Sequence, residues 1–139
     1  MLSMNCPRTI VAILVLLLVG CGRSGDQLAI KGNVTLDGEP LPEGQIIFLP
    51  QAGSVGPSAG SSIENGAYAV PADMGTLPGT FRVEIEAERK TGRKIYGSLG
   101  EEVDQVMNYI PVRYNQQSEL SVEVEIDGDN QFDFDLVSK

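Results

Sequence analysis

The chain has 139 residues, the size of one domain, and carries 19 acidic against 10 basic side chains, a net charge of −9. This balance excludes the basic surface that nucleic-acid binding requires, so we expect no nucleic-acid partner. The sequence has no histidine and only two cysteines. Since a nucleophilic triad needs a base beside its nucleophile, we predict that the protein is not an enzyme and uses no cofactor.

The chain begins with a segment that is typical of a secretory signal. Ile10–Val19 is an unbroken apolar run, about half as long as the roughly twenty residues of a membrane-spanning helix. Arg8 precedes the run. Its last two residues begin the sequence Leu18-Val19-Gly20-Cys21, and this sequence resembles the lipobox of bacterial lipoproteins. We therefore predict a lipoprotein signal peptide over 1–20 and lipidation of Cys21 by diacylglycerol and an acyl chain such as palmitate. The alternative is an ordinary signal peptide that happens to contain a cysteine.

A lipidated Cys21 would place the domain in the cell envelope, on the periplasmic face of the outer or inner membrane. Gly22 occupies the position after Cys21, where an Asp would favour the inner membrane. Residues 21–27 then form the lipidated cysteine and a short polar tether, and 28–139 form a single domain. Removing 1–20 takes away one basic residue and leaves nine basic against nineteen acidic, a net charge of about −10. The domain then contains no cysteine and no disulfide.

From Leu28 onward, apolar and polar residues alternate with a period of two, the pattern of strands that bury one face. Gln45–Leu49 is apolar on both faces, which predicts a more deeply buried strand. The pattern predicts an all-β, seven-stranded antiparallel β-sandwich. Its strands are expected at 28–36, 45–49, 58–63, 67–70, 81–88, 120–127 and 132–136.

Turn residues separate the predicted strands. Asn65-Gly66 is the strongest two-residue hairpin signal, and Asp37-Gly38 is of the same type. After Asp37-Gly38, two prolines favour an extended return in which Leu41 reaches back to the core. The stretch 127–130 is expected to join the last two strands. This turn chemistry fixes strand register, which is a role in folding.

Residues 89–118 lack the period of two. Ser98 followed by Glu101 fits a capping box, and the residues Val103, Val106 and Met107 recur at helical spacing before Pro111. We therefore predict a short helix over 99–109, although Gly100 disfavours it.

The same segment concentrates basic and aromatic side chains in an otherwise acidic protein. Loops on a rigid scaffold commonly carry binding residues, so the segment 89–114 is the candidate site for an envelope protein or a glycan. Structural capping of an open end of the sandwich would explain the same residues. The candidate contacts are Arg89, Lys90, Arg93, Lys94, Tyr96, Tyr109, Arg113 and Tyr114.

Asp127, Asp129 and Asn130 offer oxygen ligands in one loop, the kind that calcium prefers. Their spacing lacks the EF-hand pattern, and the same residues are ordinary in turns. The predicted strands that bear Glu84, Glu123 and Asp133 are acidic on one face. If these strands paired, like charges would face each other, and a bound cation would relieve the repulsion between them. Calcium binding here is a hypothesis beside the simpler turn interpretation.

Five blocks in matching order resemble a family of small planctomycete lipoproteins with carboxypeptidase-regulatory-like or transthyretin-like domains. They are GNVTLDGEPLPEGQIIFLP, NGAYAV, LPGTFRVEI, IPVRYNQQSELSVEV and GDNQFDFDL, and they span about 30–137. The resemblance implies a prealbumin-like sandwich and little about activity. Related hydrolases of the urate pathway use histidines, which this chain lacks, so that activity does not carry over.

The sequence thus predicts a membrane-anchored envelope lipoprotein whose β-sandwich is a non-catalytic interaction or structural module. The alternative is a module that binds a small ligand or a carbohydrate through 89–114.

Overall fold

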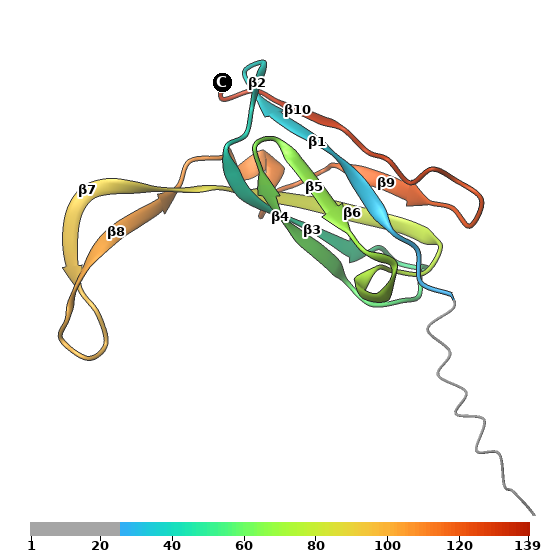
Figure 1. The fold of residues 1–139 in the computed structure, drawn as a ribbon, viewed down its shortest axis with the longest axis horizontal. Coiled ribbons are helices and arrows are strands. Elements are labelled where there is room, and N and C mark those ends of the chain that lie inside the picture. Colours follow the sequence, from blue (N-terminus) through green and yellow to red (C-terminus); the bar gives the residue numbers. More distant parts are fainter. Residues whose placement is uncertain (1–25) are drawn as a thin grey trace, which may run out of the picture.

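The computed structural model describes residues 26–139, and Figure 1 shows an all-β domain with one hairpin extending from it. The predicted signal peptide (1–20), Cys21 and most of the tether lie outside the described residues. Within 26–139, helices that combine the length and apolarity needed to cross a bilayer are absent.

The sandwich consists of one curled sheet in the order β10-β1-β5-β4-β3-β6-β9, with β2 paired to β1. Two single-turn 3-10 helices, η1 (Ala72–Met74) and η2 (Val112–Tyr114), lie in the connections. All seven predicted strands are present, and their pairings are antiparallel except that β10 runs parallel to β1. The strands are β1 (Ile30–Leu36), β2 (Glu39–Pro40), β3 (Glu43–Pro50), β4 (Ala59–Glu64), β5 (Ala67–Val70), β6 (Gly79–Glu86), β9 (Ser121–Val124) and β10 (Phe134–Leu136).

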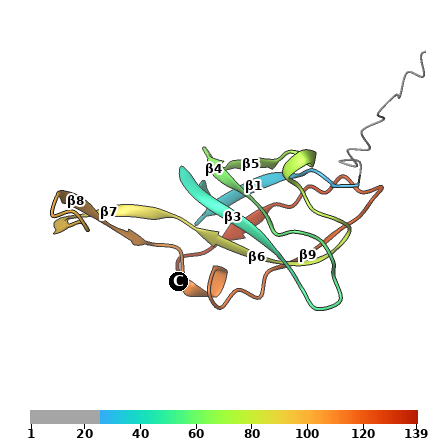
Figure 2. The ribbon, with the colours of Figure 1, turned by 90° about the horizontal axis from the view of Figure 1, so that it is seen from below.

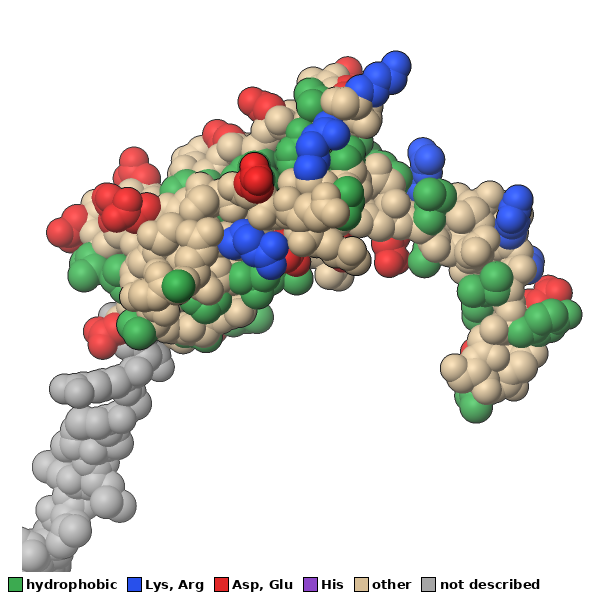
Figure 3. All heavy atoms as spheres, turned by 180° about the vertical axis from the view of Figure 1, so that it is seen from behind, with side chains coloured by type: hydrophobic (Ala, Val, Ile, Leu, Met, Phe, Trp, Pro, Cys, Tyr) green, Lys and Arg blue, Asp and Glu red, His purple; other side chains and the backbone are tan. Residues whose placement is uncertain are grey.

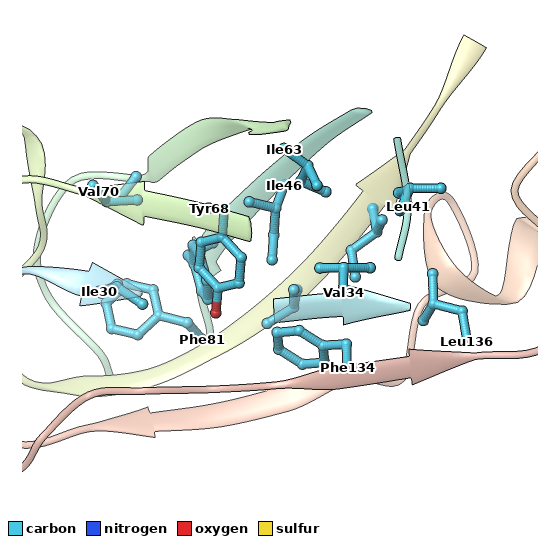
Figure 4. Close-up of a cluster of buried hydrophobic side chains, with 14 of the residues drawn as sticks. Ile30, Val34, Leu41, Ile46, Ile63, Tyr68, Val70, Phe81, Phe134 and Leu136 are labelled. Carbon is cyan, nitrogen blue, oxygen red and sulfur yellow. The ribbon is translucent and has the colours of Figure 1, made fainter. Parts of the chain in front are cut away.

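A single residue pair, Glu64 with Ala67, joins β4 to β5 in this sheet. Figure 2 shows β1 and β5 in one layer and β6 and β9 in the other. Alternate side chains of both layers meet inside, as the period of two predicts. The rings of Phe48 on β3 and Tyr68 on β5 lie 5.9 Å apart, and Figure 4 shows Tyr68 beside Ile46 and Phe81. Among the described residues, the core cluster runs from Ile30 to Leu136.

The predicted turns have the expected backbone. Asp37-Gly38 and Asn65-Gly66 have positive φ at both residues (53° and 86°, 50° and 80°), as type I′ hairpin turns require. Leu41 is buried, and its backbone N–H donates to the carbonyl of Val34 at 3.0 Å. The return strand after the first turn therefore packs onto the core as predicted.

Two local predictions are wrong. The helix expected over 99–109 does not form: Gly100 adopts a φ of 81° in a turn, and β8 (Glu102–Asn108) pairs with β7 (Glu88–Tyr96). The segment Gln45–Leu49 is not buried on both faces: Ile46 and Phe48 face the core, whereas Ile47 is 37 % exposed on the outer face of β3. β3 has a strand on each side, but the outer face of the sheet remains open to water.

Candidate functional site

The candidate site is a two-stranded hairpin that extends away from the sandwich (Figure 1). Its strands are β7 (Glu88–Tyr96) and β8 (Glu102–Asn108), which within residues 26–139 pair with each other alone. Every residue of β7 is exposed, so the hairpin has no core beneath it. A two-stranded hairpin is at best marginally stable alone in water, so its root, cross-strand contacts and tip must keep it ordered.

The root is fixed to the sandwich by Asn108. Its side-chain oxygen accepts hydrogen bonds from the backbone N–H of Ala87 (3.2 Å) and of Ile110 (3.1 Å). The N–H of Tyr109 donates to the carbonyl of Ala87 at 2.9 Å. Ala87 and Ile110 are both buried in the core cluster, so the direction in which the hairpin leaves the sandwich is set by buried residues.

The middle of the hairpin contains a β-bulge on β7. Three residues separate Lys90 from Lys94, but Gln105 alone separates their β8 partners, Val106 and Asp104. The bulge brings both ammonium groups to Asp104, at 2.7 Å and 2.6 Å. Thr91 in the bulge donates its hydroxyl hydrogen to the side-chain oxygen of Gln105 at 3.0 Å. Two of the predicted basic contacts, Lys90 and Lys94, are therefore paired with one carboxylate within the hairpin.

The two lysines lower the pKa of Asp104 from its ordinary 3.8 to about 2, through hydrogen bonds to Lys90 and then Lys94. Because the folded pKa lies below the unfolded one, these contacts stabilise the hairpin above about pH 4, and this contribution is lost as the pH falls towards 2. A carbon-detected NMR titration of the Asp104 carboxyl should give a midpoint near 2. The midpoint should move towards 3.8 in the double variant Lys90→Met/Lys94→Met; a parent midpoint near 3.8 would contradict the geometry.

The tip of the hairpin exposes apolar side chains. Gly97 donates its N–H to the carbonyl of Glu101 at 2.8 Å, and the Glu101 carboxylate accepts the N–H of Leu99 at 3.0 Å. This arrangement leaves Tyr96 77 % and Leu99 93 % exposed. Figure 3 shows hydrophobic side chains along the hairpin to its end. Ile95, Val106 and Met107 on the two strands are also exposed, so apolar side chains are in water along the length of the hairpin.

The predicted basic and aromatic residues do not form one patch. Tyr96 lies at the tip and Arg93 in the bulge, whereas Tyr109 and Tyr114 pack against the core cluster. The guanidinium of Arg89 lies over the Tyr109 ring, 5.4 Å from its centroid, in a cation–π contact. An aromatic platform of the kind that stacks against sugars is therefore not assembled by Tyr96, Tyr109 and Tyr114.

Arg113 and Tyr114 are engaged with the end of the chain. The guanidinium of Arg113 lies 4.9 Å from the Tyr114 ring centroid and donates to the carbonyls of Val137 and Lys139. The hydrogen bond from Arg113 lowers the pKa of the Tyr114 phenol. For these two residues the structure favours the predicted alternative, a structural cap.

The proposed calcium ligands lie in the connection between β9 and β10. The side-chain oxygen of Asn130 accepts the N–H of Glu125 and its amide donates to the carbonyl of Glu125, both at 2.9 Å. Asn130 is buried and has a φ of 45°, so its side chain closes the turn. Among residues 26–139 no group of three acidic side chains is arranged to hold a metal ion. Asp127 and Asp129 are exposed in the same turn.

The predicted repulsion between acidic strands does not arise, because those strands do not pair in that register. Glu123 on β9 faces Thr80, and Glu84 forms an ion pair with Arg82. Asp133 accepts the backbone N–H of Asn33 at 2.8 Å, and Asp135 accepts the hydroxyl of Thr35 at 2.8 Å. The argument for a charge-relieving cation therefore loses its premise.

Two shallow hollows adjoin the hairpin root. One, of about 250 Å³, is lined by Glu43, Gly44, Gln45, Glu86, Ala87 and Glu88. The other, of about 380 Å³, is lined by Pro42, Glu43, Asn65, Glu88, Arg89 and Tyr109. Both linings combine carboxylates with small or amide side chains, and the second also contains Arg89 and Tyr109.

The residues that sequence reasoning missed lie on β8: Asp104, Gln105 and Val106. The spacing of Val103, Val106 and Met107 suggested a helix there, and the one available signal for a turn was glycine at both Gly97 and Gly100. No family model matches this chain, no curated protein matches it, and no solved structure matches it.

Proposed function

We propose that this protein is a membrane-tethered envelope lipoprotein with a non-catalytic, prealbumin-like sandwich, and that its exposed hairpin, β7–β8, binds a partner. The observation that carries the proposal is that the hairpin has no core beneath it, yet exposes Ile95, Tyr96, Leu99, Val106 and Met107. Burying such side chains against a partner is favourable, whereas leaving them in water is not. The lipobox-like sequence ending at Cys21 supports the tether.

The distribution of charge supports the same division of roles. Within residues 26–139 the sandwich (26–87 and 109–139) contains four basic and fifteen acidic residues, whereas the hairpin (88–108) contains four of each. Like charge on two sandwiches opposes their close approach, and it opposes adsorption to anionic lipid. The neutral hairpin is thus the part of the domain that a partner can approach without this repulsion.

A carbohydrate-binding role for 89–114 fits the structure less well. It would need aromatic faces presented together, but Tyr109 and Tyr114 pack against the core and Tyr96 lies at the tip. A glycan array probed with residues 26–139 tests this alternative. Specific glycan binding that is lost in Tyr96→Ala and Tyr109→Ala would favour the carbohydrate role over the proposed one.

Photo-crosslinking in the envelope of producing cells tests the proposed role directly. A photoreactive amino acid replaces Val106 on the exposed hairpin, and the matched control places it at Ala69 on the exposed face of β5 in the sandwich. We expect discrete crosslinked products from position 106 and few or none from position 69. Equal yields from the two positions, or no product from 106, would contradict the assignment of the hairpin as the interaction element.

A further inference from the structure

The two strands of the hairpin differ in how their free edges are protected. The β7 edge carries Arg89, Lys90, Arg93 and Lys94 and contains the bulge. Lysines and bulges on an edge are devices that prevent another strand from pairing with it. β8 (Glu102–Asn108) contains no lysine, arginine or proline, and the bulge lies on β7, not on β8. β8 therefore presents the open edge of the hairpin.

The hydrogen-bond pattern shows which backbone groups point from that edge. Gly97 bonds to Glu101 at the tip, and Tyr109 bonds to Ala87 at the root. Hydrogen-bonded and non-hydrogen-bonded pairs alternate along an antiparallel ladder. Counting from both ends places Glu102, Asp104, Val106 and Asn108 in non-hydrogen-bonded pairs with β7. The N–H and C=O groups of these four residues therefore point away from β7, toward a further strand.

We propose that the strand that pairs with this edge is β8 of a second copy of the chain, running antiparallel about Gln105. The two hairpins then form one four-stranded sheet. This inference rests on the proposed function, because it assigns the partner of the hairpin. It uses the mode of β-strand addition, in which main-chain hydrogen bonds supply affinity and facing side chains supply register.

Charge and side-chain fit select this register. Centred on Gln105, the pairing places Asp104 opposite Val106 of the second copy, and Glu102 opposite Asn108, so no like charges face each other. A shift that centres the dyad on Asp104 would place that carboxylate opposite itself, which is destabilising. The Gln105 register also pairs all seven residues of β8.

The same register continues an apolar row across the new sheet. Ile95 faces Val103 within one hairpin, and Val103 would face Met107 of the second copy. Ile95 and Met107 are 44 % and 47 % exposed in the single chain, so pairing would cover surface that is otherwise in water. On the opposite face, Asp104 would have Lys94 of its own copy on one side and Val106 of the second copy on the other. Lys90 of the second copy would lie beyond that Val106.

The position of the hairpin makes this pairing compatible with two strongly acidic sandwiches. β7–β8 extends to one end of the domain, away from β1 and β9 (Figure 1). Two copies joined at β8 would therefore keep their acidic sandwiches apart. A shared membrane would further raise the effective concentration of two tethered copies.

A single introduced cysteine tests the register. Residues 26–139 contain no cysteine, so Gln105→Cys provides a unique thiol at the proposed dyad. Non-hydrogen-bonded antiparallel pairs bring Cα atoms to about 4.5 Å, within the range that a disulfide spans. Under mild oxidation we expect about tenfold more covalent dimer from Gln105→Cys than from the matched control Arg93→Cys on the β7 edge. Equal yields would overturn the proposal.

The mass of the crosslinked product separates this inference from the proposed function. A crosslinked product from position 106 with twice the mass of the chain supports self-pairing. A product of any other mass overturns self-pairing but leaves the hairpin as an interaction element, whereas no product contradicts both. A vesicle assay tests lipid as the partner instead. In this case residues 26–139 would sediment with phosphatidylglycerol vesicles, Leu99→Ser would abolish this binding, and Gln105→Cys would give no dimer. These results together would mean that the hairpin contacts lipid and that self-pairing is wrong.

Discussion

Replacing Phe48 by alanine should lower the free energy of unfolding by about 3–5 kcal/mol. Phe48 is fully buried on β3, between β4 and β6, and its ring lies 5.9 Å from that of Tyr68 on the opposite layer. The substitution therefore leaves a cavity where the two layers meet. Since the stability of a domain is about 5–15 kcal/mol in total, the variant should be close to unfolding. Urea denaturation of residues 26–139 measures the change.

The adjacent residue supplies the control. Ile47 is on the same strand but faces outward and is 37 % exposed, so Ile47→Ala should cost about 1 kcal/mol, the typical value for a single substitution. The contrast tests which face of β3 is inside. Equal losses from the two variants, or a larger loss from Ile47→Ala, would contradict the orientation of β3.

Replacing Cys21 by serine should release the protein from the membrane almost completely. Our proposal assigns membrane retention to acyl chains on Cys21, and two or three chains on one residue suffice for stable anchoring. In the described part of the chain, 26–139, no helix is long and apolar enough to cross a bilayer. Fractionation of cells labelled with a fatty-acid analogue measures both lipid incorporation and location.

The other cysteine of the chain is the matched control. Cys6 lies in the predicted signal peptide, so Cys6→Ser should stay lipidated and remain with the membrane. Retention of Cys21→Ser in the membrane fraction, or loss of Cys6→Ser from it, would contradict the proposed anchor.

Sequence periodicity predicted the sandwich because its strands each bury one face. β1, β5 and β10 alternate buried and more exposed residues, β6 alternates buried and half-buried ones, and the Asn65-Gly66 turn has the positive φ angles that its residues favour. Gln45–Leu49 misled because two apolar faces predict burial on both sides, yet Ile47 faces water. Composition alone does not distinguish a strand that has neighbours on both sides within its sheet from a strand whose two faces are both covered by other parts of the protein.

The hairpin could not be predicted in the same way because neither of its faces is buried. Val103, Val106 and Met107 therefore have no period of two to reveal a strand, and their spacing also fits a helix. The contacts of Asp104 depend on a bulge that brings Lys90 and Lys94 to one carboxylate. This bulge follows from strand pairing and the φ of 83° at Gly92, neither of which is visible as a sequence pattern.

The central claim is that a tethered sandwich presents the β8 edge to its partner, and the most direct test measures both parts together. A photoreactive residue at position 106 is compared in the parent chain and in a Cys21→Ser background. We predict a crosslinked product in the parent and about a tenfold lower yield after Cys21→Ser, because release from the membrane lowers the effective concentration of the partner. No product from the parent, or an unchanged yield in the Cys21→Ser background, would contradict the claim.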